Sequence, residues 1–272
     1  MKVTALHDRQ GNAAIMARSL TAPAIVAGLL GGLLMIVVMI LVMGSSGMGY
    51  ASPLNLGMPA FVFTITPPAS MMPSLLTAMG ITLPASVMTQ VGPALQSGHV
   101  SPAMLHHLGA MLLSMHVSAQ RVQMIGLLMT GHATNSTVVS LMSSMTPAAR
   151  NAVMSTMPVS VSHVIVGTVL HFAFAAFLGI LLFAIIGAAA WFALPGLRSP
   201  FGIIAAAMAG GALVYAVNRW GLLPSTNPMM SLVPQIAFFL AHLLFGLIVG
   251  VSLERGLRRP RVTDVLPARA NA

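Results

Sequence analysis

The sequence predicts an all-α, polytopic membrane protein: a transmembrane bundle of four spans with an extracytoplasmic helical insert. Of its 272 residues, 57% are hydrophobic and only 6% are charged, far below the roughly 25% of a soluble domain. Four apolar runs approach the ~20 residues that a helix needs to cross a bilayer. Between the first and second runs, short helical patterns replace any further span.

The chain begins with a basic segment, residues 1–23, which we expect in the cytoplasm because Lys2, Arg9 and Arg18 precede the first span. Residues 24–43 form the predicted first transmembrane helix, with Pro23 expected in its first turn. A cleaved signal peptide is the alternative. The apolar run exceeds the 7–15 residues of a typical signal core, which favours a retained anchor.

The insert, residues 44–162, is rich in methionine: 13 of the 23 methionines lie between Pro68 and Ser160. Its first part, residues 47–68, is apolar but interrupted by prolines, and we expect it to be re-entrant or interfacial. Because Arg121 and Arg150 are its only fixed charges, we expect the insert to lie on the membrane or against the spans. Capping signals predict helices at Ala85–Gln96, Pro102–His116, Ala119–Thr130, Ser136–Met145 and Pro147–Met157.

The region 163–253 holds the other three predicted spans, at Val164–Ile186, Phe201–Val217 and Pro234–Leu253. A loop is expected at Gly221–Ser231. Residues 254–272 form a basic tail, which we expect to be solvated and cytoplasmic.

Two spans each carry one histidine, His171 and His242, which we expect on the bundle interior. Small residues recur four positions apart beside both, as at Ala175 and Gly246, so both faces are predicted packing faces. His171 lies eight residues after His163, and His242 lies eight residues after Pro234. If His163 and Pro234 mark the same membrane surface, both histidines lie ~12 Å below it, at 1.5 Å of helix rise per residue, and the two side chains could meet. They are either satisfied packing groups or joint ligands of a metal or of haem b iron. In a third hypothesis they handle protons or substrate, with Gln235 and Asn218 as further polar lining of the bundle.

Soft thioethers favour Cu(I), and imidazole also suits copper. The competing interpretation is that methionine fills irregular gaps in a helical core. If copper is bound, the candidate ligands besides the two span histidines are Met35, Met39, Met43, His107, Met111, Met115, Met142, Met145, Met154 and Met157.

Several chemistries are excluded for the spans and the insert, because Asp8, Glu254 and Asp264 are the only carboxylates. Paired-carboxylate catalysis and a Ser-His-Asp triad have no acid there. The chain has no cysteine, which excludes thiolate metal sites. Nucleic-acid binding is disfavoured, since the basic residues flank apolar spans. No catalytic constellation is visible, and an enzyme is not expected.

Several short motifs recur in a known group of proteins: Leu170-His171, Pro200-Phe201-Gly202, Asn227-Pro228, the segment from Ala241 to Gly246, and Ala51-Ser52-Pro53-Leu54 after the first span. Through them, about half of the chain resembles a group of uncharacterised bacterial four-span inner-membrane proteins. This resemblance implies a four-span fold and carries over no activity. The favoured function is therefore a structural or accessory membrane protein without a cofactor. Its expected partner is the lipid bilayer, and another membrane protein or a second copy of the chain is a further candidate. Copper or haem handling and a small transporter or channel are the alternatives.

The positive-inside rule makes a topology prediction. Basic residues precede the first span, separate the second from the third, and follow the fourth, so both termini should be cytoplasmic. Reporter fusions at Ser140 and after Ala272 should then report opposite sides of the membrane. A cytoplasmic result at Ser140 would contradict this topology.

Overall fold

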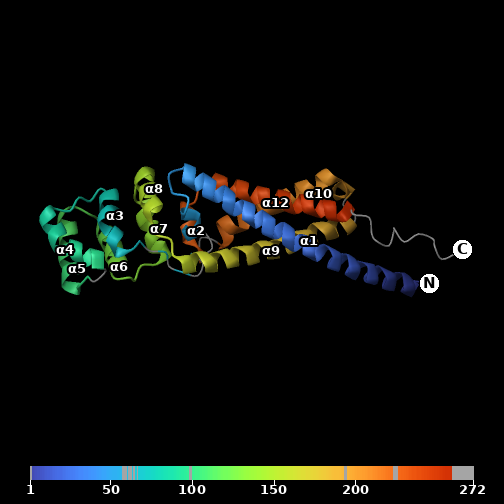
Figure 1. Cartoon of the computed structure of the whole chain (residues 1–272), viewed down its shortest axis with the longest axis horizontal. Coiled ribbons are helices and arrows are strands. Elements are labelled where there is room, and N and C mark those ends of the chain that lie inside the picture. The colour runs from blue at the N-terminus through green and yellow to red at the C-terminus, as the bar shows by residue number, and fades with distance from the viewer. Residues whose placement is uncertain are drawn as a thin grey trace. The chain divides into compact units, whose positions relative to one another are not determined.

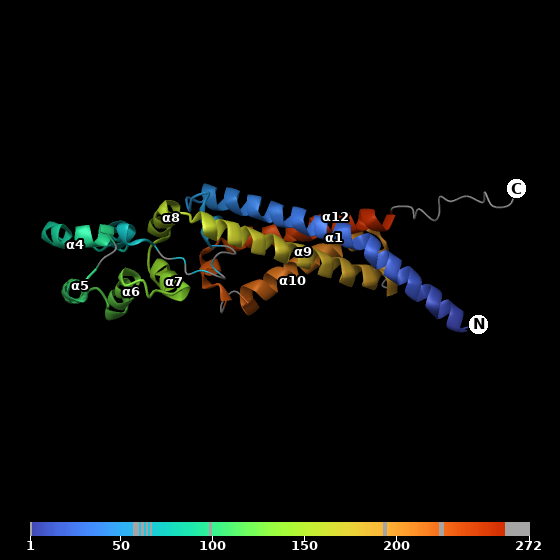
Figure 2. The same ribbon diagram turned by 60° about the horizontal axis from the view of Figure 1, so that its bottom comes forward.

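The computed structural model describes residues 2–56, 60, 63, 65, 67–97, 100–192, 195–222 and 226–258. This described part contains helices and turns and no strand (Figures 1 and 2). Four helices are long and apolar enough to cross a membrane: Thr21–Ser45, Val161–Ala189, Pro200–Leu222 and Gln235–Arg258. The predicted all-α architecture with four candidate spans is therefore confirmed.

The chain divides into two compact units, described here in turn. The bundle unit contains Met1–Ile36, His171–Ala216 and Phe239–Ala272. The insert unit contains Val37–Leu170 and Val217–Phe238.

The first helix, α1 (Lys2–Ser45), is longer than predicted. Pro23 lies inside it and not in its first turn, so that expectation is wrong. Good helix formers such as Ala13, Ala14 and Ala17 precede the proline. A helix can continue through a proline when its other backbone hydrogen bonds outweigh the lost one.

The later helices begin or end within a few residues of their predicted positions. They are α9 (Val161–Phe192), α10 (Pro200–Ala216) and α12 (Gln235–Arg258). A short 3₁₀ helix, η3 (Pro195–Arg198), precedes α10, and a π-helix, η4 (Val217–Leu222), continues it. The predicted loop at Gly221–Ser231 also contains the 3₁₀ helix η5 (Pro228–Leu232), so it is more ordered than expected.

In the bundle unit, α1 and α9 are in backbone contact. A Cβ added at Gly179 would lie 2.6 Å from the Ala24 carbonyl oxygen and 2.8 Å from the Gly28 Cα. A Cβ added at Gly28 would lie 2.9 Å from the Ala176 Cα. Real side chains are not found at these distances, so the two helices pack this closely only because these positions are glycine.

A second close pair is formed by α10 and α12. A Cβ at Gly246 would lie 2.8 Å from the Met208 Cα, and one at Gly250 would lie 2.9 Å from the Ile204 Cα. A Cβ at Gly211 would collide with the carbonyl group of His242. The small residues that the sequence places on one face of each span are therefore at helix–helix contacts, as predicted.

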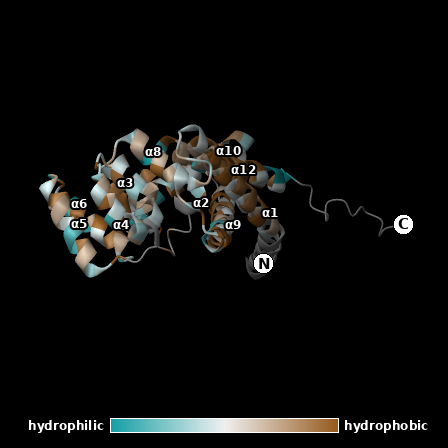
Figure 3. Ribbon diagram, turned by 60° about the vertical axis from the view of Figure 1, so that its left-hand side comes forward, coloured by the Kyte–Doolittle hydropathy of each residue, from teal (hydrophilic) through white to brown (hydrophobic). Residues whose placement is uncertain are grey.

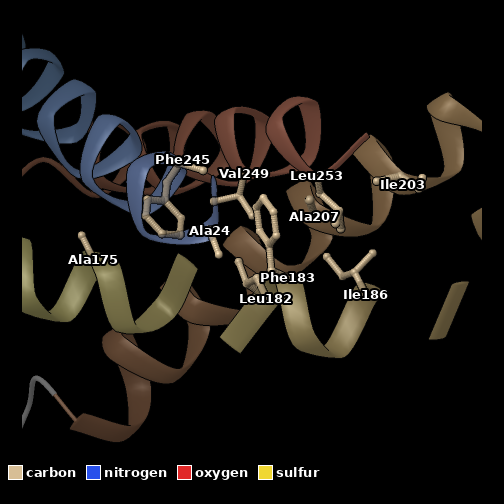
Figure 4. Packing of buried hydrophobic residues seen from close by; sticks show 11 residues of the cluster. Ala24, Ala175, Leu182, Phe183, Ile186, Ile203, Ala207, Phe245, Val249 and Leu253 are labelled. Carbon is tan, nitrogen blue, oxygen red and sulfur yellow. The ribbon is translucent and has the colours of Figure 1, made fainter. Parts of the chain in front are cut away.

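Larger side chains join the two pairs. The Phe245 ring of α12 packs against Gly31 of α1, and Leu182 of α9 packs against Gly210 of α10. Side chains from all four helices converge in one buried cluster (Figure 4). Its members are Ala24, Ala27, Ala175, Leu182, Phe183, Ile186, Ile203, Ala207, Phe245, Val249 and Leu253.

The insert unit contains the short helices α2 (Ser52–Leu56), η2 (Ala69–Met71), α3 (Met72–Ala78), α4 (Ala85–Ser97), α5 (Pro102–Ser114), α6 (Ala119–Met129), α7 (Asn135–Ser143) and α8 (Pro147–Thr156). Four of them start at a hydroxyl side chain that accepts a backbone hydrogen bond: Ser101, Ser118, Thr134 and Thr146. These caps satisfy donors that every helix start leaves unpaired. All five predicted helices of the insert are found near their predicted bounds, and these caps explain the starts of four of them, α5 to α8.

The insert helices bury their apolar faces among themselves: α5 packs on α6, α6 on α7, and α3 on α8. Within residues 67–94 and 100–160, Leu113 is the only large hydrophobic side chain that is exposed. Figure 3 shows that the two sets of helices differ in hydropathy: α9, α10, α12 and the coloured part of α1 are mostly hydrophobic, whereas α3 to α6 are mixed. The insert therefore has a packed core of its own.

The glycine contacts predict that two alanine substitutions change the free energy of unfolding differently. Gly246→Ala should lower the free energy of unfolding by about 1–3 kcal/mol, because the new methyl group meets backbone. Gly187→Ala is the matched control in α9, where an added Cβ meets nothing within 4 Å. It should be neutral or stabilising by up to ~1 kcal/mol. Unfolding in mixed detergent micelles measures both, and equal effects would contradict the packing.

Candidate functional site

His171 joins α9 to α1. Its Nε2 lies 2.9 Å from the carbonyl oxygen of Gly32, and its ring makes an edge contact with Phe172. A carbonyl only accepts hydrogen bonds, so Nε2 carries the proton and donates. A Cβ at position 32 would lie 2.7 Å from the Ala175 Cβ and 3.3 Å from Nε2, so a larger residue there would require its neighbours to shift. Glycine at this position therefore lets Ala175 and the imidazole pack directly against α1.

His242 is almost fully buried on α12, with 2% of its surface exposed. Its ring stands edge-on to Tyr215 of α10, with 5.9 Å between the ring centroids. Tyr215 makes a similar contact with Phe239, at 5.2 Å. His242 therefore belongs to a row of rings between α10 and α12, next to the position where Gly211 meets its backbone carbonyl.

The two histidines thus engage different helices. His171 makes its hydrogen bond to Gly32 and its ring contact to Phe172, and makes neither to His242. Among the described residues, no group of three or more His, Cys, Asp or Glu side chains is placed to hold a metal ion. The prediction that both lie at helix–helix contacts agrees with the structure, and their joint ligation of an iron or metal stays a prediction.

The other two polar residues singled out in the spans lie in the insert unit. Gln235, at the start of α12, donates from Nε2 to the carbonyl oxygens of Val233 and Met230, at 2.8 and 3.2 Å. It therefore closes the turn between η5 and α12. Asn218 is half-buried in the π-helix η4. These hydrogen bonds give the amide nitrogen of Gln235 a local structural role, while its buried Oε1 has no hydrogen-bond partner among the described residues.

The candidate methionine ligands fall into two classes by burial. Met39, Met43, Met142, Met145, Met154 and Met157 are buried, and Met35, Met111 and Met115 are half-buried. His107, expected on one face with Met111 and Met115, is exposed. Flexible thioethers thus fill much of the core of the insert unit, as the packing interpretation expects.

Four buried methionines lie on neighbouring backbone segments where the end of α1 contacts α8: Met43, Met48, Met154 and Met157. The Met48 N–H donates to the Met43 carbonyl at 3.0 Å and Gly47 has a φ of +81°, which is a Schellman helix end. The buried Ser52 hydroxyl donates to the Met48 carbonyl and lies 3.3 Å from that of Met154. In a Schellman helix end, an apolar residue of the last helical turn normally contacts the residue that follows the left-handed glycine. Here these two residues are Met43 and Met48.

The structure also reveals residues that sequence reasoning missed. Asn135 donates from Nδ2 to the carbonyl oxygens of Ala60 and Phe63, both at 3.0 Å, and accepts from the Ile65 N–H at 2.7 Å. The Phe63 ring stacks on His163 with 4.0 Å between centroids. Asn135 follows the N-cap of α7, and an asparagine inside a helix start was the only available signal.

Comparisons with known proteins add no assignment: no protein-family model, curated protein or solved structure matches the chain. The candidate sites therefore rest on the geometry of the chain itself.

The Gly32 contact predicts a graded response at position 171. His171→Leu should lower the free energy of unfolding by about 1 kcal/mol, because the donor to Gly32 is lost inside the bundle. His171→Gln keeps an N–H donor and should lose less. Unfolding in mixed micelles measures both variants. A leucine variant as stable as the wild type would show that this hydrogen bond does not hold the helices together.

Proposed function

We propose that this multi-pass protein is a structural or accessory protein of a bacterial inner membrane, whose four-helix bundle anchors the helical insert outside the cytoplasm. That the protein crosses a membrane several times follows from four helices that are long and apolar enough to span one. Their outward faces carry large exposed apolar side chains, such as Leu30 on α1 and Phe177 and Ile185 on α9. Such surfaces require a lipid environment.

The orientation follows from charge. The chain has 12 Lys and Arg residues against three acids, and most of them flank the spans at the two termini. The positive-inside rule favours cytoplasmic termini, which puts the insert on the other side. The insert is then presented outside the cytoplasm by the bundle.

The single observation that supports a packing role most strongly is the hydrogen bond from His171 to Gly32. A metal-binding imidazole uses the lone pair of one ring nitrogen. Here Nε2 is protonated and 2.9 Å from a backbone carbonyl, between two helices in glycine-mediated contact. This hydrogen bond occupies Nε2 and joins α9 to α1, while Nδ1 keeps the only lone pair of the ring. It supports the packing role by what it joins, because a metal-binding imidazole can also donate its other N–H to a carbonyl.

One observation favours the soft-metal alternative as a second candidate. Met43, Met48, Met154 and Met157 are all buried, at 0–6% exposure, on the segments that Ser52 joins. Thioethers gathered in one place suit Cu(I). The same burial is what a methionine-filled core requires, which is why this candidate ranks second.

One experiment separates the two candidates. The protein extracted in mild detergent is examined for a haem absorption band, and its metal content is measured after incubation with excess Cu(I) and gel filtration. We expect no haem band and far less than one copper ion per chain. Stoichiometric copper that disappears in the Met154→Leu/Met157→Leu double variant would overturn the packing proposal and establish the second candidate.

A further inference from the structure

The hairpin of α5 and α6 gathers the ionisable side chains of the insert. Seven Lys, Arg or His residues lie in residues 44–162, and six of them fall between positions 99 and 132: His99, His106, His107, His116, Arg121 and His132. His99 lies outside the described residues. No Asp or Glu occurs between Asp8 and Glu254, so no carboxylate of the insert offsets these charges.

The structure places these histidines on the surface. The two helices pack through an apolar inner face that includes the buried Leu108, Leu112 and Ile125. His106, His107, His116 and His132 are all exposed. Arg121 is half-buried, and its guanidinium donates to the Ser144 carbonyl oxygen at 3.3 Å. Neither α7, packed on α6, nor α4 contains a titratable side chain.

The same surface carries one exposed apolar residue. Leu113 is 50% exposed, and it is the only large hydrophobic side chain that is exposed in residues 67–94 and 100–160. His106, Ala110 and Leu113 follow the i, i+4, i+7 spacing, so they share one face of α5. All three are exposed. The outer face of α5 thus combines histidines with one protruding leucine.

We propose that the α5–α6 hairpin is a docking surface for an anionic phospholipid bilayer and that acidification turns it on. Imidazole side chains ordinarily gain a proton near pH 6.5. In its protonated form, each of the four exposed histidines adds a positive charge to that of Arg121. Attraction to anionic headgroups grows about fivefold per basic side chain at the surface. The exposed Leu113 favours a lipid surface over a soluble polyanion, because a leucine gains from insertion at the headgroup boundary.

This interaction goes beyond anchoring of the insert, and its test does not depend on topology or on the role of the span histidines. The absence of cysteine allows one label per chain. Leu113→Cys in the full chain, held in zwitterionic nanodiscs, is labelled with an environment-sensitive fluorophore. Gln90→Cys on α4, also exposed, is the matched control. Vesicles containing phosphatidylglycerol are added at pH 5.5 and 7.5. A parallel sample uses nanodiscs that contain phosphatidylglycerol, so that binding to the protein's own bilayer is also seen.

We expect a blue shift at position 113 with anionic lipid at pH 5.5, at least tenfold weaker binding at pH 7.5, and no shift at position 90. Phosphatidylcholine alone should give no shift. Replacing the histidines (His106→Gln, His107→Gln, His132→Gln, His116→Asn) should abolish the difference between the two pH values. Asparagine is chosen at position 116 because His116 has a φ of +62°, in the left-handed region that asparagine tolerates better than glutamine. Lysine at positions 106, 107 and 132 should give binding at both pH values.

Three results would overturn the proposal. The first is no shift at position 113 in either format. The second is equal binding at both pH values in the wild type. The third is binding of soluble polyglutamate that is as tight as vesicle binding, which would identify a polyanion site and not a lipid surface.

Discussion

The bundle depends on the close approach of helix backbones at glycine. Gly28 and Gly179 let α1 meet α9, and Gly246 and Gly250 let α10 meet α12. Lipid chains are as apolar as leucine, so the hydrophobic effect contributes little to association of helices inside a bilayer. Close packing and hydrogen bonds must supply the stability instead. The contact between His171 and Gly32 combines both, because one glycine provides the space and the acceptor.

The insert unit follows a different rule. Its core is built from many short helices with few aromatic side chains and no carboxylate, and methionine fills the spaces between them. Caps such as Thr134 start the helices, and Asn135 ties α7 to the segment around Phe63. Most large apolar side chains of the insert helices lie in this core, so the surface that remains is polar, and the insert has no carboxylate. Its ionisable side chains are chiefly histidines, and the four described ones lie on or beside the α5–α6 hairpin.

The sequence predicts local features well and long-range partners poorly. Span positions follow from hydropathy and length, and the insert helices from hydroxyl caps before proline, as at Ser101 and Thr146. The face that His171 occupies also follows from its spacing to Ala175. What could not be predicted is which helix opposes that face, because Gly32 lies 139 positions earlier. Asn135 was missed for the same reason, since its partners are 70 to 75 positions away. The length of α1 was missed because basic residues before a span do not exclude helix.

The central claim is that glycine faces bring specific helices into contact, and cysteine pairing in native membranes tests it most directly. A Cβ at Gly32 would lie 2.7 Å from that of Ala175, about 1 Å closer than the ~3.8 Å between the Cβ atoms of a disulfide, so a small separation of the two helices lets the bond form. The Gly32→Cys/Ala175→Cys chain, with a protease site engineered between α4 and α5, is oxidised, cleaved and run on a denaturing gel. The account predicts that the two halves stay joined, while the lipid-facing control Leu33→Cys/Ala175→Cys separates. Equal cross-linking of both pairs, or none at Gly32 and Ala175, would contradict it.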